Sequence, residues 1–557
     1  MDPSRPLIVQ SDRTVLLEAQ SPRYAEARDA ISPFAELEKS PEHVHTYRLT
    51  PLSVWNAAAT GISAERVLSV LTELSKYPLP ANVRQDVEQW FERYGRVRLE
   101  SDASGMALVS DDAAVLAEIA ASALVRPYLR GEVAGGRVPV DGAYRGHVKQ
   151  ALIRLGYPVE DLAGYVEGGP LEIALLAPRN GRAGVQLRPY QEESVATFWQ
   201  GGSVRGGSGV IVLPCGAGKT VVGLGVMARC RTKTLVLTTN TIAVRQWRDE
   251  LLARTDLSPD DVGEYTGEAK EVRPVTIATY QILTYRRSKT DGFAHFDLFR
   301  RNDWGLIVYD EVHLLPAPVF RVTAEIQATR RLGLTATLVR EDGKEEDVFT
   351  LIGPKRFDVP WKVLEAQGWI ATAECREVRV PLPDELRMDY AVADGRAKFR
   401  IASESHAKIG VTQRLVRHHA GDQVLVIGQY IGQLETLARV LGAPLITGRT
   451  PTRERQQLYD AFRRGDIGLL LVSKVGNFAI DLPDASVLVQ VSGTYGSRQE
   501  EAQRLGRILR PKQRGDAATF YSVVTRDTRD QDFAGNRQLF LTEQGYSYRI
   551  VDADEIQ

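Results

Sequence analysis

The sequence predicts an α/β fold in which two parallel-sheet lobes follow a helical N-terminal region and a small α/β module. Beyond Leu187, short apolar runs alternate with amphipathic helical stretches. Runs that are apolar on both faces and separated by helices are typical of parallel sheets covered by helices on both sides. The chain has 557 residues, which is too long for one hydrophobic core, so we expect several domains.

Residues 1–104 are expected to form a mainly helical domain. Apolar residues recur at helical spacing in 64–74 and again in 83–91, and two prolines, Pro78 and Pro80, separate these stretches. Residues 105–182 are expected to form the small α/β domain. This part holds a strand-like MALVS, a helical stretch over 111–124 and a glycine-rich hairpin around 131–140.

The predicted strands of the two lobes fall into two groups. The first lobe, placed at 183–375, is predicted to contain strands 210–213, 234–237, 275–278, 306–309 and 332–334. The second lobe, placed at 376–557, is predicted to contain strands 423–427, 444–446, 468–472, 486–491 and 518–523. Each strand is followed by a helical stretch, as βαβ units require.

The composition is that of an ordinary globular protein, with 43% hydrophobic and 25% charged residues. The formal net charge is −1, so any contact with nucleic acid has to come from local groups of Lys and Arg. Three scattered cysteines, Cys215, Cys230 and Cys375, fit neither a disulfide framework nor a zinc site. Neither a membrane span nor a signal peptide is visible, so a cytoplasmic location without membrane contact is expected.

The segment GVIVLPCGAGKT at 209–220 predicts a nucleotide-binding turn. An apolar strand runs into Gly216 and Gly218, whose backbone N–H groups can surround a polyphosphate. Lys219 can add charge for the outer phosphates, and the Thr220 hydroxyl can bind Mg²⁺. Leu213 stands where the full pattern has glycine, and the alternative is a strand–turn–helix in which GKT has arisen by chance.

Asp310 and Glu311 follow the predicted strand 306–309 directly and precede His313. Ligands bind at the carboxyl ends of parallel strands, so Asp310 and Lys219 are expected to converge. Asp310 suits magnesium binding, and Glu311 suits orienting and deprotonating an attacking water. An isolated Asp-Glu pair after a strand is usually a solvated loop, but together with the glycine turn it predicts hydrolysis of a nucleoside triphosphate.

Gln503, Arg507 and Arg510 lie in QRLGRILR, far along the chain in the second lobe. The two arginines are three residues apart and so share one face of a helix. Guanidinium groups stabilise charge on a transferring phosphoryl group, and an arginine supplied in this way is worth about 10³–10⁵ in rate. The alternative is a basic surface helix. With the other motifs, we expect hydrolysis to depend on movement of the second lobe.

In this order, the motifs resemble those of superfamily 2 helicases: Gln191 in LRPYQ, then GAGKT, DEVH, Thr335-Ala336-Thr337 and QRLGRILR. Arg340-Glu341-Asp342 after the TAT motif, and SKVGNFAIDLP before SRQEEAQRLGRILRPK, narrow the resemblance to the XPB helicase family. It is dense over 187–524, and the N-terminal part resembles bacterial members. It implies two RecA-like motor lobes and an ATP-dependent 3′→5′ DNA helicase or translocase of nucleotide excision repair or transcription.

The resemblance also implies residue roles, with ATP and Mg²⁺ as cofactors. It assigns adenine recognition to Arg188 and Gln191 and contact with the ribose to Asp481. His313, Thr335 and Thr337 would relay the state of the bound nucleotide to the nucleic-acid groove. It places Arg340, Glu341 and Asp342 near the point of strand separation, where a surface pairing of Arg340 with Asp342 is the alternative. The DNA strand would be held by Thr239, Thr279, Tyr280, Gln429, Tyr430, Thr447, Gly448, Ser473 and Lys474, hydroxyl and backbone contacts that grip phosphates without reading sequence.

Some features depart from the family pattern. Asn477 stands where many relatives have Asp, and residues 383–405 are too polar and too short to delimit the thumb element of some members. The module at 105–182 matches a damage-recognition domain by position, but it has no series of aromatic residues for base stacking.

Three alternative functions remain open. An RNA helicase would share the motor and would be distinguished by comparing ATPase stimulation by RNA and DNA. A motor that moves duplex for a nuclease partner would unwind weakly alone. A nucleotide-switched scaffold would keep its function without hydrolysis. The expected partner in the main interpretation is DNA, forked or at a junction of single strand and duplex.

Overall fold

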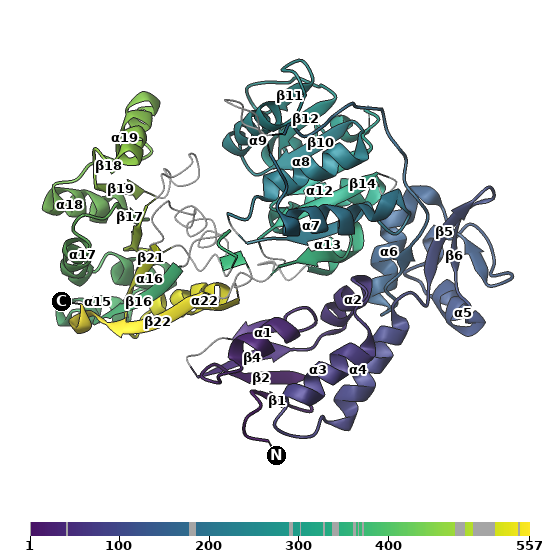
Figure 1. The fold of residues 1–557 in the computed structure, drawn as a ribbon, viewed down its shortest axis with the longest axis horizontal. Coiled ribbons are helices and arrows are strands. Elements are labelled where there is room, and N and C mark those ends of the chain that lie inside the picture. The colour runs from purple at the N-terminus through teal and green to yellow at the C-terminus, as the bar shows by residue number, and fades with distance from the viewer. Residues whose placement is uncertain are drawn as a thin grey trace. The chain divides into compact units, whose positions relative to one another are not determined.

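The computed structural model describes residues 2–39, 43–177, 185–214, 216–288, 293–300, 302–326, 329–336, 345–359, 364–365, 367–369, 373–473, 485–493, 518–543 and 546–556. Most of residues 1–359 form one compact unit, residues 360–557 belong to a second one, and we describe each by itself. Figure 1 traces both units along the chain. Among the described residues, no helix combines the length and the apolar character that a membrane crossing requires.

The N-terminal region combines helices with a four-stranded sheet of order β1-β2-β4-β3. The helix predicted over 64–74 is confirmed as α3, but the prediction of a mainly helical domain missed the sheet. Its strands are only three to five residues long, so their alternation of buried and exposed side chains is too brief to stand out. The elements are β1 (Leu7–Val9), β2 (Thr14–Glu18), α1 (Tyr24–Ile31), β3 (Glu36–Lys39), β4 (Val44–Arg48), α2 (Pro51–Ala59), α3 (Ala64–Leu74) and α4 (Ala81–Arg93).

The small module has a sheet of order β7-β6-β5-β8 with helices α5 and α6. The boundary predicted at 104/105 is wrong, because it falls inside the hairpin in which β5 pairs antiparallel with β6. The module buries its own core around Leu99, Leu108 and Leu116. Its elements are β5 (Arg98–Asp102), β6 (Gly105–Val109), α5 (Ala113–Ala121), β7 (Arg137–Pro139), α6 (Arg145–Arg154) and β8 (Glu160–Asp161).

The first lobe contains a seven-stranded parallel sheet of order β11-β12-β10-β13-β14-β9-β15. The five predicted strands are confirmed as β9 (Ser208–Val212), β10 (Thr234–Thr238), β12 (Val275–Thr279), β13 (Leu306–Asp310) and β14 (Arg330–Thr335). The two edge strands, β11 (Val262–Tyr265) and β15 (Lys355–Asp358), were not predicted because each is half-exposed and lacks a continuous apolar run. The helices are α7 (Pro189–Trp199), α8 (Lys219–Cys230), α9 (Thr241–Arg254), α10 (Tyr280–Leu283), α11 (Asp297–Arg300), α12 (Ala317–Glu325) and α13 (Glu345–Leu351).

The second unit repeats this architecture with a parallel sheet of order β18-β19-β17-β20-β21-β16-β22. The five predicted strands are confirmed as β17 (Val424–Gly428), β18 (Leu445–Ile446), β19 (Leu469–Ser473), β20 (Val487–Gln490) and β21 (Ala518–Thr525), whereas β16 (Ala373–Val380) and β22 (Ser547–Asp552) were missed. The boundary predicted at 375/376 is wrong, because it cuts β16, which pairs with β21 along its whole length.

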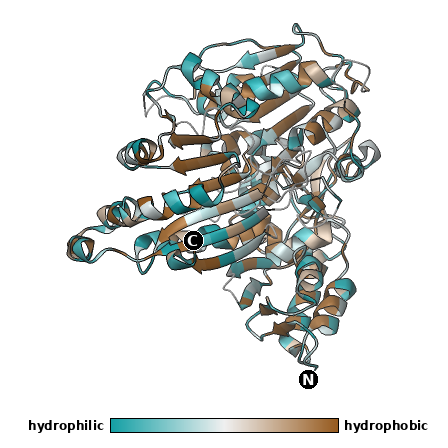
Figure 2. Cartoon of the chain, turned by 60° about the vertical axis from the view of Figure 1, so that its left-hand side comes forward, coloured by the Kyte–Doolittle hydropathy of each residue, from teal (hydrophilic) through white to brown (hydrophobic). Residues whose placement is uncertain are grey.

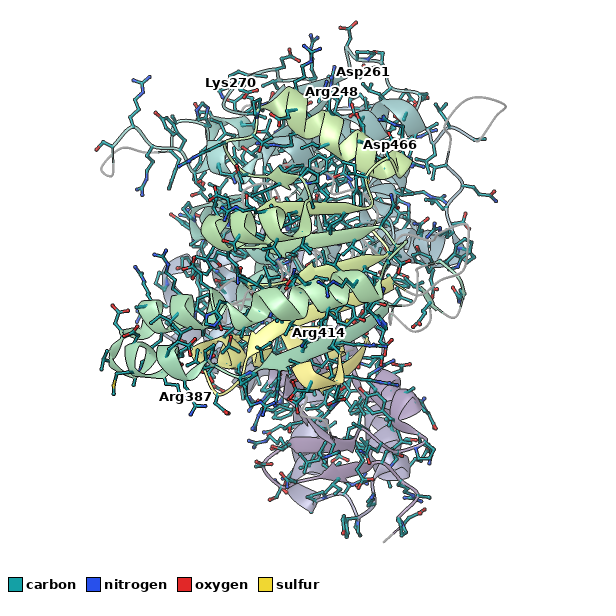
Figure 3. The ribbon with its side chains drawn as sticks, turned by 90° about the vertical axis from the view of Figure 1, so that its left-hand side faces the viewer. Arg248, Asp261, Lys270, Arg387, Arg414 and Asp466 are labelled. Atoms are coloured by element: carbon teal, nitrogen blue, oxygen red, sulfur yellow. The ribbon has the colours of Figure 1, made fainter. Side chains whose placement is uncertain are left out.

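The helices of this unit are α15 (Asp384–Val392), α16 (Gly395–Ser403), α17 (Ala407–His418), α18 (Ile431–Leu441), α19 (Thr452–Arg464) and α22 (Arg529–Glu543). The stretch 383–405, which the sequence left undelimited, forms the helices α15 and α16. Figure 2 shows apolar strands with helices that alternate between apolar and polar residues. Figure 3 marks Arg414 on α17, whose guanidinium donates to the carbonyls of Ala553 and Ile556 and so fastens the C-terminal turn.

Candidate active site

The glycine turn after β9 leads directly into helix α8. Gly216 and Gly218 adopt left-handed backbone conformations, with φ of +80° and +79°. Its left-handed φ favours glycine at Gly218, and a Cβ there would also lie 2.6 Å from Nε2 at the end of the Gln191 side chain. No side chain caps the start of α8, which leaves its first N–H groups to face an anion. Leu213, in the place of the missing glycine, is fully buried, and its N–H donates to the Thr335 carbonyl at 3.0 Å.

Gln191 lies beside this turn because it belongs to the first turn of α7. Its side-chain Oε1 accepts a hydrogen bond from the Arg188 N–H at 3.0 Å, which caps the helix. The Arg188 guanidinium donates to the Tyr190 hydroxyl at 3.1 Å. The structure therefore brings Arg188 and Gln191 next to the phosphate turn, and their recognition of adenine stays a prediction.

Lys219, Asp310 and Glu311 converge at the carboxyl ends of β9 and β13. The Lys219 ammonium lies 3.4 Å from Oε1 of Glu311, and both side chains are largely buried. β13 ends at Asp310, and the chain turns sharply there, because Glu311 has a left-handed φ of +49°. Asp310 Oδ1 accepts the Glu311 N–H at 3.1 Å. The two sequence motifs thus form one polar cluster in the first lobe.

The two neighbouring carboxylates have opposite electrostatic environments. Burial, and then the charge of Glu311, raise the pKa of Asp310 to about 6, although a hydrogen bond from Trp247 opposes the shift. Burial also disfavours ionisation of Glu311, but Lys219 and His313 together lower its pKa. Paired acidic groups whose pKa values are driven apart are typical of a site with distinct chemical roles. Glu311 is thus the carboxylate that stays ionised.

His313 connects this cluster to the end of β14. Its Nδ1 lies 2.5 Å from the Thr335 hydroxyl and 3.5 Å from Oε2 of Glu311. Both His313 and Thr335 are buried. The structure therefore joins two of the three residues predicted to couple the nucleotide state, and the third, Thr337, lies outside the described residues.

The residues present fit ATP and Mg²⁺. The uncapped helix start and Lys219 suit phosphates, and the oxygens of Thr220 and Asp310 are the hard ligands that Mg²⁺ prefers. Mg²⁺ in such sites is held by one or two protein oxygens together with the phosphates of the substrate.

The predicted DNA-contacting residues of the first lobe lie after neighbouring strands. Thr238, before Thr239, pairs in register with Thr279. Thr279 accepts the Ile282 N–H at 3.3 Å, and the buried Tyr280 donates its hydroxyl to the Asp310 carbonyl at 2.9 Å. Thr279 and Tyr280 are both 4% exposed, so their side chains do not offer the predicted surface contact. Backbone groups of this turn and the half-buried Thr239 remain as candidates.

The corresponding residues of the second unit also share one sheet edge. Gln429 and Tyr430 follow β17, Thr447 and Gly448 follow β18, and Ser473 ends β19, which lies between these two strands. The Gln429 N–H donates to the Ser492 hydroxyl at 2.8 Å, and the Thr447 hydroxyl accepts the Arg449 N–H at 3.2 Å. Ser473 is 1% exposed, so its side chain is internal.

Several predicted residues lie outside the described residues, and their roles stay predictions: Arg340, Glu341, Asp342, Lys474, Asp481, Gln503, Arg507 and Arg510. Trp247 on α9 was missed by the sequence analysis, although its indole N–H donates to Oδ2 of Asp310 at 2.9 Å. The available signal was weak: a buried tryptophan needs an acceptor for its N–H, but the acceptor is 63 residues away in sequence.

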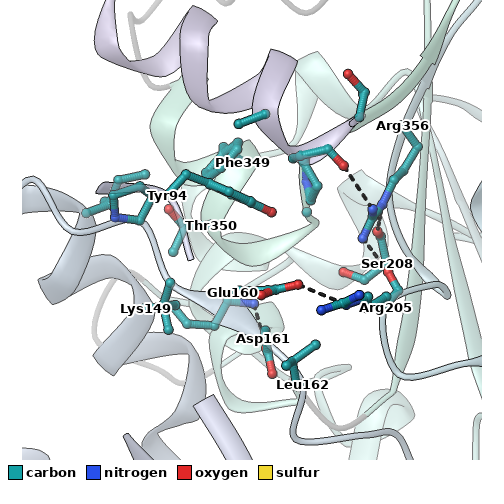
Figure 4. A pocket seen from close by; sticks show the side chains of 18 of the residues that line it. Tyr94, Lys149, Glu160, Asp161, Leu162, Arg205, Ser208, Phe349, Thr350 and Arg356 are labelled. Carbon is teal, nitrogen blue, oxygen red and sulfur yellow. Dashed lines mark hydrogen bonds and ion pairs between the residues drawn. The ribbon is translucent and has the colours of Figure 1, made fainter. Parts of the chain in front are cut away.

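A cavity of about 410 Å³ lies in the first unit where the N-terminal region, the small module and the first lobe meet. Figure 4 shows its charged groups paired with one another and with backbone carbonyls. The Arg356 guanidinium donates to the carbonyls of Ala59 and Ser208, and Lys149 pairs with Asp161 at 3.0 Å. The bond from Arg356 on β15 to Ala59 at the end of α2 joins the first lobe to the N-terminal region, so the cavity lies at a polar junction.

Three family models match the chain. The model described as ERCC3/RAD25/XPB C-terminal helicase matches residues 364–556, the helicase conserved C-terminal domain matches 7–134, and the type III restriction enzyme res subunit matches 184–340. The second match spans the N-terminal region and the first part of the small module, through β5, β6 and α5.

Relatives match over nearly the whole chain. The DNA 3′-5′ helicase XPB of Kineococcus radiotolerans is 58% identical, with 99% of this chain and 97% of the relative covered. The protein of the same name from Mycobacterium tuberculosis is 56% identical, with 99% and 98% covered. The XPB/SSL2 helicase/translocase subunit of general transcription and DNA repair factor IIH from Saccharomyces cerevisiae is 32% identical, with 98% and 72% covered. Given these identities and the polar cluster at Lys219, Asp310 and Glu311, the chain belongs to the XPB helicase family.

Proposed function

We propose that this protein is an ATP-dependent DNA helicase of 3′→5′ polarity that opens DNA in nucleotide excision repair or transcription. The names of its relatives, DNA 3′-5′ helicase XPB and the factor IIH subunit, support the substrate, the polarity and the processes. The observation that carries the proposal is the Lys219–Glu311 pair, 3.4 Å apart beside Asp310 at the carboxyl edge of the first sheet. This arrangement suits hydrolysis of a nucleoside triphosphate.

The geometry suggests how these side chains act in turn. The start of α8 and Lys219 bind the phosphates of ATP, and Thr220 and Asp310 hold Mg²⁺, which neutralises phosphate charge when bound. Lys219 exchanges its contact with Glu311 for one with the phosphates. Glu311, which stays ionised, then orients the attacking water and accepts its proton. His313 transmits the change in nucleotide state to Thr335 through the hydrogen bond between them.

The remaining predicted residues complete the proposal. Gln503, Arg507 and Arg510 stabilise the charge on the transferring phosphoryl group, which makes hydrolysis depend on the second lobe. The residues at the carboxyl ends of β10, β17 and β18 contact the DNA backbone, and the proposed substrate is forked DNA. Replacing Arg507 by Ala is expected to lower DNA-stimulated ATP hydrolysis strongly, and an unchanged rate would rule out this role.

The central test is Glu311→Gln. The substitution keeps the size of the side chain but removes the base, so the rate of ATP hydrolysis should fall by about 10²–10⁴-fold while ATP binding persists. Glu268→Gln is the matched control, because Glu268 is 79% exposed and lies away from the cluster. Equal hydrolysis by the two variants would contradict the proposed role of Glu311.

Unwinding assays test the substrate and the polarity. Forked DNA with only a 3′ single-stranded tail should be unwound, and the same fork with only a 5′ tail should not. Stronger ATPase stimulation by RNA would indicate an RNA helicase instead. Strong unwinding only with an added nuclease partner would indicate a motor for that partner. Full repair function in the Glu311→Gln variant would indicate a nucleotide-switched scaffold.

A further inference from the structure

Trp247 makes a specific contact with the carboxylate that is proposed to hold magnesium. Its side chain is 1% exposed on α9, and its indole N–H donates to Oδ2 of Asp310 at 2.9 Å. The other carboxylate oxygen, Oδ1, accepts the Glu311 N–H. Each oxygen of Asp310 therefore has a fixed donor, which sets the rotation of the carboxylate plane.

The indole itself is held in place by helix α8. A Cβ on Gly223 would lie 2.5 Å from Cη2 of Trp247, so the absence of a side chain there lets the ring pack against the helix backbone. Gly223 stands one turn after Lys219 on the same helix. Trp247 thus spans from the helix that begins at the phosphate turn to the carboxylate at the end of β13.

Asp310 needs such external support because the chain leaves the sheet immediately after it. Glu311 has a left-handed φ of +49°, a conformation that surrounding contacts must maintain in a residue other than glycine. A second aromatic side chain contributes here, since the Tyr280 hydroxyl donates to the Asp310 carbonyl at 2.9 Å. Trp247 holds the side chain of Asp310, and Tyr280 holds its backbone.

We propose that Trp247 is a positioning residue that orients the Asp310 carboxylate for binding of Mg²⁺ with ATP. The inference rests on the proposed function, because it assumes that Asp310 serves the metal. A tryptophan that only filled space would contribute through its ring, whereas a positioning residue contributes through its N–H. Removal of the N–H alone should therefore weaken metal binding only if Trp247 is a positioning residue.

The test is Trp247→Phe, measured first as metal binding without turnover. Binding of Mn²⁺, followed by electron paramagnetic resonance with a non-hydrolysable ATP analogue, should weaken about 10-fold, as for other hydrogen-bond partners of metal ligands. In turnover, the Mg²⁺ concentration for half-maximal ATPase should rise by a similar factor, while kcat at saturating Mg²⁺ changes much less. The matched control is Trp304→Phe, because Trp304 is also buried in the first lobe but donates its N–H to the Leu298 carbonyl at 2.8 Å.

A second variant separates the N–H from the ring. Replacing Trp247 by 3-benzothienylalanine keeps the bicyclic shape and removes only the donor, and its thermal unfolding midpoint checks that the lobe is folded. Weaker Mn²⁺ binding by this variant, with the Trp304→Phe variant unchanged, supports the inference. Mn²⁺ binding equal to wild type overturns it, and the proposed function then stands. Absence of nucleotide-dependent Mn²⁺ binding in the wild-type protein overturns both.

Discussion

Each of the two parallel sheets has a lysine–carboxylate pair near the carboxyl ends of its strands, and the two pairs differ in separation and in burial. Lys219 and Glu311 in the first lobe are 3.4 Å apart and 14% and 16% exposed. Lys408 and Asp530 in the second unit are 2.6 Å apart and wholly buried. The Lys408 ammonium also donates to the carbonyls of Val491 and Val523.

The difference separates the pair that is proposed to act in hydrolysis from a structural one. The Lys408 ammonium has three N–H donors and three close acceptors, so all of its hydrogen-bonding capacity is used. These bonds join α17 to the ends of two strands and to α22. Lys219 makes a longer contact with Glu311 at the mouth of the glycine turn. A pair of this kind can exchange one partner for a phosphate at small cost, whereas the buried pair cannot open without leaving charges in a low dielectric.

Removing the buried lysine should have the largest effect. Lys408→Met is expected to lower the free energy of unfolding by about 3–5 kcal/mol, because it leaves the Asp530 carboxylate buried without its countercharge. Denaturant unfolding measures this loss. The double variant Lys408→Met with Asp530→Asn should recover part of it, and a single variant as stable as wild type would show that the pair is not structural.

Removing Lys219 from the first-lobe pair should affect catalysis instead. Lys219→Ala is expected to lower ATP hydrolysis by at least about 10²-fold, as loss of one charge-stabilising donor does in other sites. Its free energy of unfolding should fall by less than in Lys408→Met, since the Lys219–Glu311 pair is longer and less deeply buried. If steady-state hydrolysis stayed near wild type while stability fell as far as in Lys408→Met, the distinction between the pairs would fail.

The ionised carboxylate of Asp310 should lower the stability of the protein without ligands. Its pKa of about 6 lies above the ordinary value of 3.8, so the folded state binds more protons than the unfolded state in this window and stability falls as pH rises from about 4 to about 6. Asp310→Asn should abolish activity yet raise the free energy of unfolding at pH 7 by about 2 kcal/mol and remove this pH dependence. Unfolding curves at pH 4, 5, 6 and 7 check both the sign and the window.

Gly223→Ala should have the smallest effect on stability among these variants, and it should also have a measurable effect on function. The added methyl group has to displace the Trp247 ring, at a cost of about 1 kcal/mol, and the Mg²⁺ dependence of the ATPase should weaken with it. Gly410→Ala on α17 is the matched control, because a Cβ there meets nothing within 4 Å. Identical Mg²⁺ dependence in the two variants would indicate that the position of Trp247 is not critical.

The sequence predicted the central strands of both lobes because β9, β10 and β13 are buried along their apolar runs. It failed at β1, which is only three residues long, and at β15 and β22, which are partly exposed and carry no continuous apolar run. The domain boundaries predicted at 104/105 and 375/376 failed for a related reason. A hairpin turn and the middle of β16 look like linkers until strand pairing is known.

The candidate site divides in the same way. Lys219, Asp310 and Glu311 were predicted to converge, because glycine spacing and the end of a buried strand are local features whose consequence at a parallel sheet edge is general. The inward orientation of Thr279, Tyr280 and Ser473 was not predictable. Those residue types suit a phosphate contact or an internal hydrogen bond equally well, and only burial distinguishes the two.

By itself, the sequence determined the fold class of the two lobes, the phosphate turn and the identity of the charged residues, because these depend on patterns within a few residues. Only the tertiary structure decided which lysine–carboxylate pair is wholly buried, and that Trp247 and Tyr280 donate hydrogen bonds to Asp310. Distance and burial between residues far apart in the chain set these properties. No local pattern encodes a hydrogen bond from α9 to the end of β13.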